Sequence, residues 1–195
     1  MPANYFAVFL VRDPRGVMNS RDSMDWCAKS SCNDPKVLCD NMHDDLLQAT
    51  EIKKQFPERV HLVRYEDLCL YPFRQMDKIL DFLSLPRKPL IEKHLEETTS
   101  SKRANEQAEP SPSFNHVGVK RKKENPYSTT RNSKVTVFAW RQKIKPSEVE
   151  EIQSVCRKAM ESLGYEAFSN IEDELKDDGI IVLKPLSSVN ITGTP

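Results

Sequence analysis

Residues 5–21 read YFAVFLVRDPRGVMNSR, and this stretch decides the expected fold. Its first part, 5–11, is short and almost wholly apolar, which is typical of a strand buried on both faces of a parallel sheet. Asp13 can cap a helix and Pro14 can occupy its first position, so a helix is expected to run to about Arg21. The stretch therefore predicts a strand, a tight turn and a helix, and such turns favour anion binding.

Strand and helix patterns continue to alternate after this stretch. Apolar residues recur every three or four positions between Leu38 and Phe56, which predicts an amphipathic helix that opens near Pro35 and ends before Pro57. Further along, the pattern predicts a strand at 59–65 and helices at 72–83, 89–97 and 146–163, the last one stopped by Gly164. The alternation indicates the α/β class, with parallel-sheet strands flanked by helices.

Two segments lack such patterns. Residues 98–133 are rich in Ser, Lys, Arg, Asn, Glu and Pro, so they are expected to form an irregular loop, either disordered or involved in binding. The chain is expected to be ordered again near 135–141. Residues 169–195 are expected to be a weakly ordered tail, which leaves one domain over 1–168.

The chain has 29 Lys and Arg residues and 29 Asp and Glu residues, so no global field attracts it to nucleic acid or to an anionic membrane. Any anion site must therefore be local. The basic run at 120–123 lies in the polar loop, where charge runs are usually solvated. No apolar run approaches the roughly 20 residues that span a bilayer.

The cysteine and histidine spacings predict no metal site. Five cysteines form no CxxC pair, and four histidines show no helical pairing. Cys27 with Cys32, or Cys39 with Cys156, could form a disulfide in an oxidising compartment. Because the number of cysteines is odd, at least one thiol stays free.

Arg12 and Ser20 are the candidate anion ligands. Arg12 follows the expected strand, and Ser20 lies two turns into the expected helix, so both side chains can point at one phosphate. A guanidinium offers a planar fork to phosphate oxygens, and a hydroxyl donates a further hydrogen bond. The alternative is that Arg12 pairs with Asp13 or Asp67 at the surface and that Ser20 is simply solvated.

Glu66 and Asp67 follow Arg64 and Tyr65 and resemble a catalytic carboxylate pair. Adjacent carboxylates on an extended segment point to opposite faces, however, and cannot share one substrate atom. A structural role is expected instead, in which one of them bridges the strand end to an arginine such as Arg12 or Arg15.

The stretch from Val11 to Arg21 resembles the 3'-phosphate-binding motif of sulfotransferases, in which an Arg and a Ser eight residues apart hold the 3'-phosphate of the donor. Arg12 and Ser20 match these two residues. Further similarities to the Golgi enzymes that sulfate the 6-hydroxyl of N-acetylglucosamine, galactose or N-acetylgalactosamine follow in order at 63–68, 79–83, 131–133, 140–141 and 163–165. The resemblance covers about residues 5–168.

The resemblance implies a partial P-loop-like sulfotransferase fold whose N-terminal half, with the 5'-phosphosulfate site and a membrane anchor, is missing, so that the first strand has a bare apolar edge. It also implies sulfuryl transfer from 3'-phosphoadenosine 5'-phosphosulfate, without a metal, to a glycan or glycosaminoglycan in the Golgi lumen. The alternative is a non-catalytic, truncated nucleotide-binding or interaction protein. A P-loop kinase is excluded because GxxxxGK[ST] does not occur.

By the same resemblance, Arg131 at the end of the polar loop is a second arginine that could contact phosphate. Arg12 and Ser20 are expected to bind the donor and not to act as acid or base. The catalytic base stays unassigned. Trp140 is expected to pack in the core, and the resemblance also points to a bridge between Cys39 and Cys156, which the sequence leaves open.

Overall fold

In the part of the chain that the structure describes, two short strands are accompanied by a larger set of helices. The computed structural model describes residues 5–27, 30–100, 102–103, 132–176 and 183–184. In chain order the elements are β1 (Ala7–Val11), α1 (Pro14–Asp22), η1 (Ser31–Asn33), α2 (Pro35–Gln55), β2 (Val60–Arg64), α3 (Tyr65–Leu70), α4 (Pro72–Phe82), α5 (Pro89–Thr99), α6 (Ser133–Thr136), η3 (Ala139–Gln142), α7 (Pro146–Leu163) and α8 (Ile171–Lys176).

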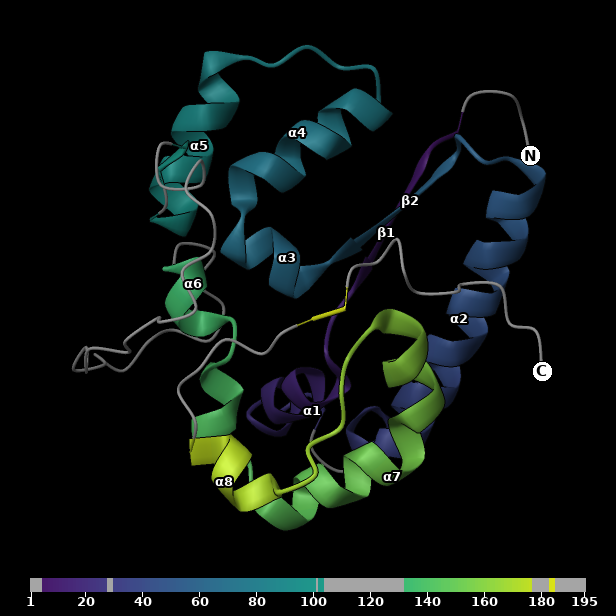
Figure 1. The fold of residues 1–195 in the computed structure, drawn as a ribbon, viewed down its shortest axis with the longest axis vertical. Helices are drawn as coiled ribbons and strands as arrows, with labels where there is room; N and C mark the ends of the chain where they lie inside the picture. The colour runs from purple at the N-terminus through teal and green to yellow at the C-terminus, as the bar shows by residue number, and fades with distance from the viewer. Residues whose placement is uncertain (1–4, 28–29, 101, 104–131, 177–182, 185–195) are drawn as a thin grey trace.

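The strands β1 and β2 pair in parallel, with Ala7 opposite Val60 and Val11 opposite Arg64. They run side by side through the middle of the molecule, with helices on either side (Figure 1). The connection between them contains α1, η1 and α2, as the crossover between parallel strands requires. The α/β class and the parallel pairing expected from the sequence are confirmed.

The strand β1 is not buried on both faces, so that prediction is wrong. Phe6, Val8 and Leu10 are 44%, 42% and 55% exposed, and within the strand only Val11 is buried. In the described part of the chain β2 is the sole neighbour of β1, so its other edge is unpaired there. The side chains of Phe9, Val11 and Leu62 pack on the main core, so the bare side chains belong to the opposite face.

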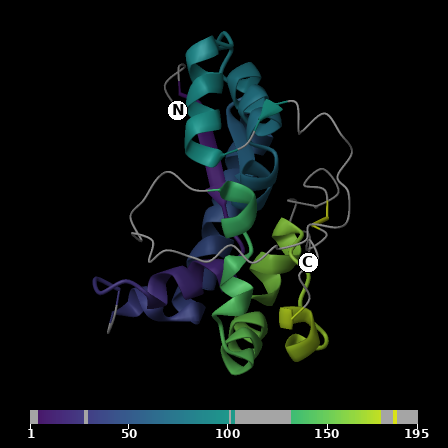
Figure 2. The ribbon, with the colours of Figure 1, turned by 90° about the vertical axis from the view of Figure 1, so that its left-hand side faces the viewer.

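The main core lies between α2 and α7, which pack along each other beside the sheet (Figures 1 and 2). Apolar side chains from both helices, from α1 and from the segment after α7 form one continuous cluster, which includes Leu46, Val149, Ile152, Cys156, Met160, Leu163 and Phe168. The expected inward stripe of α2 is interrupted at its end, because Phe56 is 40% exposed.

The helix α7 begins and ends where its sequence directs. Pro146 occupies its first turn, and the Glu148 carboxylate accepts a hydrogen bond from the backbone amide of Lys145 at 3.1 Å. At the other end Gly164 has a φ of 76°, in the left-handed region that favours glycine. The amide of Tyr165 donates to the carbonyl of Met160 at 2.9 Å, which closes the helix end.

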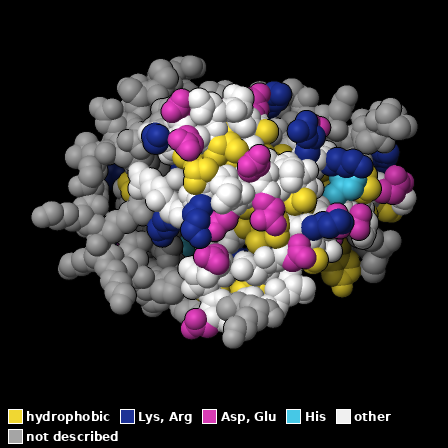
Figure 3. Space-filling view, turned by 90° about the horizontal axis from the view of Figure 1, so that it is seen from below, with side chains coloured by type: hydrophobic (Ala, Val, Ile, Leu, Met, Phe, Trp, Pro, Cys, Tyr) yellow, Lys and Arg dark blue, Asp and Glu magenta, His cyan; other side chains and the backbone are white. Residues whose placement is uncertain are grey.

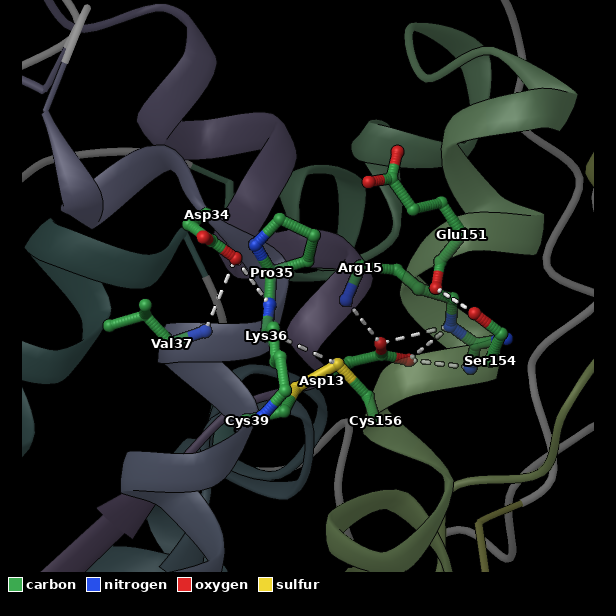
Figure 4. Close-up of a disulfide and its surroundings, with 10 residues drawn as sticks. All are labelled: Asp13, Arg15, Asp34, Pro35, Lys36, Val37, Cys39, Glu151, Ser154 and Cys156. Carbon is green, nitrogen blue, oxygen red and sulfur yellow. Dashed lines mark hydrogen bonds and ion pairs between the residues drawn. A yellow bond between two sulfur atoms is a disulfide. The ribbon is translucent and has the colours of Figure 1, made fainter.

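The structure contains two disulfides, one between α2 and α7 and one between the turn after α1 and η1. Cys39 of α2 and Cys156 of α7 are bonded, with their Cα atoms 5.1 Å apart (Figure 4). Cys27 and Cys32 are bonded, with their Cα atoms 5.6 Å apart. Both separations lie in the ordinary range for disulfides. Cys69 is buried and free, as the odd number of cysteines requires.

The helix α8 and the residues 183–184 lie inside the segment 169–195, where we expected weak order. The carbonyl of Lys184 accepts a hydrogen bond from Arg64 Nη1 at 2.7 Å, so this piece of the tail contacts the end of β2. No helix of the described segments has the length and apolarity needed to cross a bilayer. The face seen from below carries interspersed acidic and basic side chains, as the balanced charge suggests (Figure 3).

Candidate functional site

The candidate site begins at the turn between β1 and α1. The carboxylate of Asp13 caps α1 by accepting a hydrogen bond from the backbone amide of Arg15 at 2.9 Å, and Pro14 occupies the first helical position. Arg12 therefore directly follows the carboxyl end of a parallel strand. Ligands in open α/β sheets collect at this edge.

The guanidinium of Arg12 packs on an aromatic ring and not on a carboxylate. Its central carbon lies 4.5 Å from the centroid of the Tyr65 ring, directly after β2. The Nε of Arg12 is buried and has no hydrogen-bond partner among the described residues. Asp13 and Asp67, the two acids that could have neutralised Arg12, pair instead with Arg15 at 2.7 Å and with Arg64 at 2.8 Å.

Arg12, Gly16 and Ser20 follow one another at intervals of four residues. A Cβ atom built on Gly16 would lie only 3.2 Å from Arg12 Nε, so the arginine side chain lies against this side of α1. Residues four apart share a helix face, and Ser20 is therefore one turn further along that face. Ser20 is partly buried, and its carbonyl accepts a hydrogen bond from Ser23 Oγ at 2.8 Å.

The structure describes two of the three expected phosphate ligands. Arg12 lies against α1 beside Gly16, and Ser20 is one helical turn beyond Gly16 on the same helix. Arg131, the third, lies outside the described residues, as does the basic run at 120–123.

A buried carboxyl, Glu66, supports the turn from behind. One of its oxygens accepts a hydrogen bond from the backbone amide of Asp13 at 3.1 Å, and the other accepts from the Tyr165 hydroxyl at 2.7 Å. Only 1% of Glu66 is exposed. Burial, with a smaller contribution from the charge of Asp13, raises the pKa of Glu66 to about 7. Burial also raises the pKa of Tyr165 well above its usual value.

The expected bridge from Glu66 or Asp67 to Arg12 or Arg15 is wrong. The segment is not extended, because β2 ends at Arg64 and the helix α3 begins at Tyr65. Acidic residues in a first helical turn are favourable, since they face the positive end of the helix dipole. On this helix Glu66 points inward, and Asp67 turns back to Arg64, so the two carboxylates still do not share a target.

The pair formed by Asp13 and Arg15 extends the buried network to α7. The Nη1 of Arg15 donates to Gln153 Oε1 at 2.9 Å, and Gln153 Oε1 also accepts from the backbone amide of Phe168 at 2.7 Å. Figure 4 shows Asp13 and Arg15 close to the disulfide of α2 and α7. A buried arginine with both a carboxylate and an amide partner is well satisfied, so Arg15 holds the turn and is not available to a ligand.

The remaining ionisable groups beside Arg12 are not nucleophiles. Burial raises the pKa of Cys69 to about 11 and the pKa of Tyr65 to about 12. Both groups therefore stay protonated at neutral pH, and a protonated thiol is unreactive. Among the described residues beside the turn, Arg12 offers an anion a guanidinium without a carboxylate partner, whereas Glu66 is 1% exposed and is held by the Asp13 amide and Tyr165.

The sequence predicted a structural role for Glu66 or Asp67, but it did not reveal that Glu66 contacts the Asp13 amide and the Tyr165 hydroxyl. Glu66 and Tyr165 stand in the motifs at 63–68 and 163–165, so a signal was present. Their contact joins positions 99 residues apart, and a pattern of local spacing cannot reveal such a contact.

A protein-family model and several curated proteins match the sequence of this chain. The family model of the sulfotransferase domain matches residues 4–164. Carbohydrate sulfotransferase 1 of Danio rerio is 29% identical over 93% of this chain and 43% of its own length. Carbohydrate sulfotransferase 4 of Mus musculus is 24% identical over 97% of this chain and 48% of its own length. The chain thus spans less than half the length of these curated relatives, and no solved structure matches it.

Proposed function

Because the chain belongs to the sulfotransferase domain family, we propose that it is part of an enzyme that transfers a sulfuryl group to a sugar hydroxyl. The sulfate donor is 3'-phosphoadenosine 5'-phosphosulfate. Relatives named carbohydrate sulfotransferases support a glycan or glycosaminoglycan acceptor. Within that class we propose the 6-hydroxyl of N-acetylglucosamine, galactose or N-acetylgalactosamine, and action of the whole protein in the Golgi lumen.

One observation carries the donor-binding part of the proposal. Arg12 follows the carboxyl end of β1, has a buried Nε without a hydrogen-bond partner among the described residues, and is not neutralised by Asp13 or Asp67. An arginine left in this state can give a phosphate strong, charge-assisted hydrogen bonds. Ser20 adds a hydroxyl donor from the same side of α1, and Arg131 adds a second guanidinium.

These residues fix the donor and do not take part in proton transfer. In the proposed reaction the acceptor oxygen attacks sulfur in line, and the bond between sulfur and the phosphate oxygen breaks. The hydroxyl proton passes to a general base, which is not assigned, and adenosine 3',5'-bisphosphate leaves. Holding the 3'-phosphate sets the register of the donor, so binding energy at Arg12 contributes to positioning.

Binding of adenosine 3',5'-bisphosphate tests the proposal directly. By isothermal titration, Arg12→Ala should bind it roughly 100-fold more weakly, as loss of a charge-assisted hydrogen bond implies, and Ser20→Ala roughly tenfold more weakly. Arg157→Ala and Ser154→Ala change exposed residues of α7 and serve as matched controls. Equal affinity in Arg12→Ala and the wild type would refute the proposed site.

Turnover separates the enzyme from a non-catalytic nucleotide-binding protein. The purified chain is incubated with donor carrying radioactive sulfate and with an acceptor that ends in N-acetylglucosamine. Transfer that Arg12→Ala abolishes would support the enzyme. Retained bisphosphate binding without transfer, even at high donor concentration, would show that this chain alone does not catalyse the reaction.

A further inference from the structure

The indole of Trp140 is almost completely buried beside Gly16 of α1. It is 2% exposed, and its ring stacks on Phe168 with the centroids 6.2 Å apart. The guanidinium of Arg15 lies 5.2 Å from the ring centroid, so aromatic and cationic groups hold the ring. The indole Nε1, however, is buried and has no hydrogen-bond partner among the described residues. Buried indole N–H groups usually find one.

Gly16 brings this nitrogen close to Arg12. A Cβ atom built on Gly16 would lie 3.3 Å from Trp140 Nε1 and 3.2 Å from Arg12 Nε. Both atoms therefore approach one point beside α1, and only the missing side chain of glycine allows it. Tryptophan and arginine are donors only, so these two N–H groups cannot satisfy each other.

Two buried donors that both lie close to Gly16 can be satisfied by one anionic acceptor. The charge of Arg12 attracts the anion, and an oxygen with several lone pairs can accept from both nitrogens. The Arg12 guanidinium is held by its packing on Tyr65, and Asp13 and Asp67 have other arginine partners. No described carboxylate that could compete with an anion is therefore paired with Arg12.

We propose that Trp140 is an additional binding residue for the 3'-phosphate, donating its indole N–H to an oxygen that Arg12 also holds. The inference rests on the proposed function, because it takes the donor nucleotide as the anion. Trp140 adds a directed hydrogen bond without adding charge. Because this hydrogen bond goes to the same phosphate that Arg12 holds, its loss should weaken binding only of nucleotides that carry a 3'-phosphate.

The test removes the N–H group and keeps an aromatic ring. Trp140→Phe is titrated with adenosine 3',5'-bisphosphate and with adenosine 5'-phosphate, which lacks the 3'-phosphate. We expect affinity for the bisphosphate to fall roughly tenfold to 100-fold, the effect of one hydrogen bond to a charged group, and affinity for the monophosphate to stay unchanged. Trp26→Phe, at a 64% exposed tryptophan, is the control.

A second variant guards against a general packing defect in Trp140→Phe. Gly16→Ala keeps both donors but places a methyl group between them, and alanine favours the helix. It should weaken binding of the bisphosphate and leave binding of the monophosphate unchanged, although the new methyl group, 3.1 Å from Trp140 Cδ1, lowers thermal stability. In Trp26→Phe, Trp140 is the only tryptophan, and its fluorescence should change on addition of the bisphosphate but not of the monophosphate.

The outcomes separate this inference from the proposed function. If Arg12→Ala loses bisphosphate binding and neither Trp140→Phe nor Gly16→Ala weakens it, the role of Trp140 is refuted and the proposed function stands. If Arg12→Ala also binds normally, both are refuted. An equal loss of both nucleotides in Trp140→Phe would indicate a packing role only and would overturn the inference.

Discussion

The helix pair of α2 and α7 and the strand β1 are both rich in apolar residues, yet their burial differs. In the helix pair, Val149, Cys156 and Leu163 are completely buried, and a disulfide joins the two helices. In β1, Val8 and Leu10 stay about half exposed. The difference teaches that an apolar sequence makes an element ready to be buried, whereas burial itself depends on the neighbours that the fold supplies.

The largest expected change in the free energy of unfolding comes from the disulfide between α2 and α7. Replacing both Cys39 and Cys156 by serine opens a link across 117 residues, and the lost constraint on the unfolded chain is about 5 kcal/mol. Replacing Cys27 and Cys32 opens a link across 5 residues and should cost only about 2 kcal/mol. Urea unfolding measures both. Equal losses would contradict the expectation that the long link dominates.

Two leucines, one from the helix pair and one from β1, test this difference in burial. Leu163→Ala removes a side chain with 0% exposure and should lower the free energy of unfolding by about 3 kcal/mol. Leu10→Ala removes a side chain with 55% exposure and should cost less than about 1 kcal/mol. The measurement is urea unfolding of the two variants beside the wild type. A large loss in Leu10→Ala would mean that β1 is covered in solution.

Glu66 joins the turn after β1 to Tyr165, which lies just beyond the end of α7. Its pKa rises from 4.5 in the unfolded chain to about 7 in the folded protein, chiefly because it is buried. The folded state therefore favours the protonated carboxyl, and this group's contribution to stability is full below pH 4.5 and is lost as pH rises towards 7. The loss is about 2 to 3 kcal/mol.

Glu66→Gln removes this titration while it keeps a group of the same shape. The variant should gain stability relative to the wild type between pH 4.5 and 7.5, as urea unfolding across that range will show. Glu150→Gln, at an exposed position of α7, is the control. Parallel stability curves for Glu66→Gln and the wild type would be inconsistent with a buried, proton-binding carboxyl.

The smallest effect on stability is expected at the open side of β1. Val8→Lys places a charge on a 42% exposed position and should change the free energy of unfolding by less than about 1 kcal/mol. A charged edge strand resists pairing with another chain, so self-association should fall. Sedimentation at increasing protein concentration measures it. Unchanged association would show that the bare side chains of β1 take no part in it.

Local patterns in the sequence predicted most elements of this fold. Apolar spacing predicted α2, α4 and α7, and the run before Arg12 predicted a strand that pairs in parallel with β2. Cap residues at Asp13 and Gly164 marked the helix ends, because their geometry depends only on neighbouring backbone. The helix α3 was missed, since it is only six residues long and follows a strand without a break.

Partners distant in sequence could not be predicted, and they shape the candidate site. The sequence pointed to Arg12 and Ser20, but it also allowed Arg12 to pair with Asp13 or Asp67. The structure pairs those acids with Arg15 and Arg64. Which guanidinium each carboxylate pairs with depends on how α1, β2 and α3 pack together.

By itself the sequence determined the α/β alternation, the turn that carries Arg12 and the family resemblance, because each depends on residues close together in the chain. Only the tertiary structure decided that Glu66 supports this turn, that Trp140 and Arg12 meet at Gly16, and that β1 keeps one bare face. The physical reason is that burial and hydrogen-bond satisfaction depend on neighbours in space. Such neighbours are set by the packing of the whole chain.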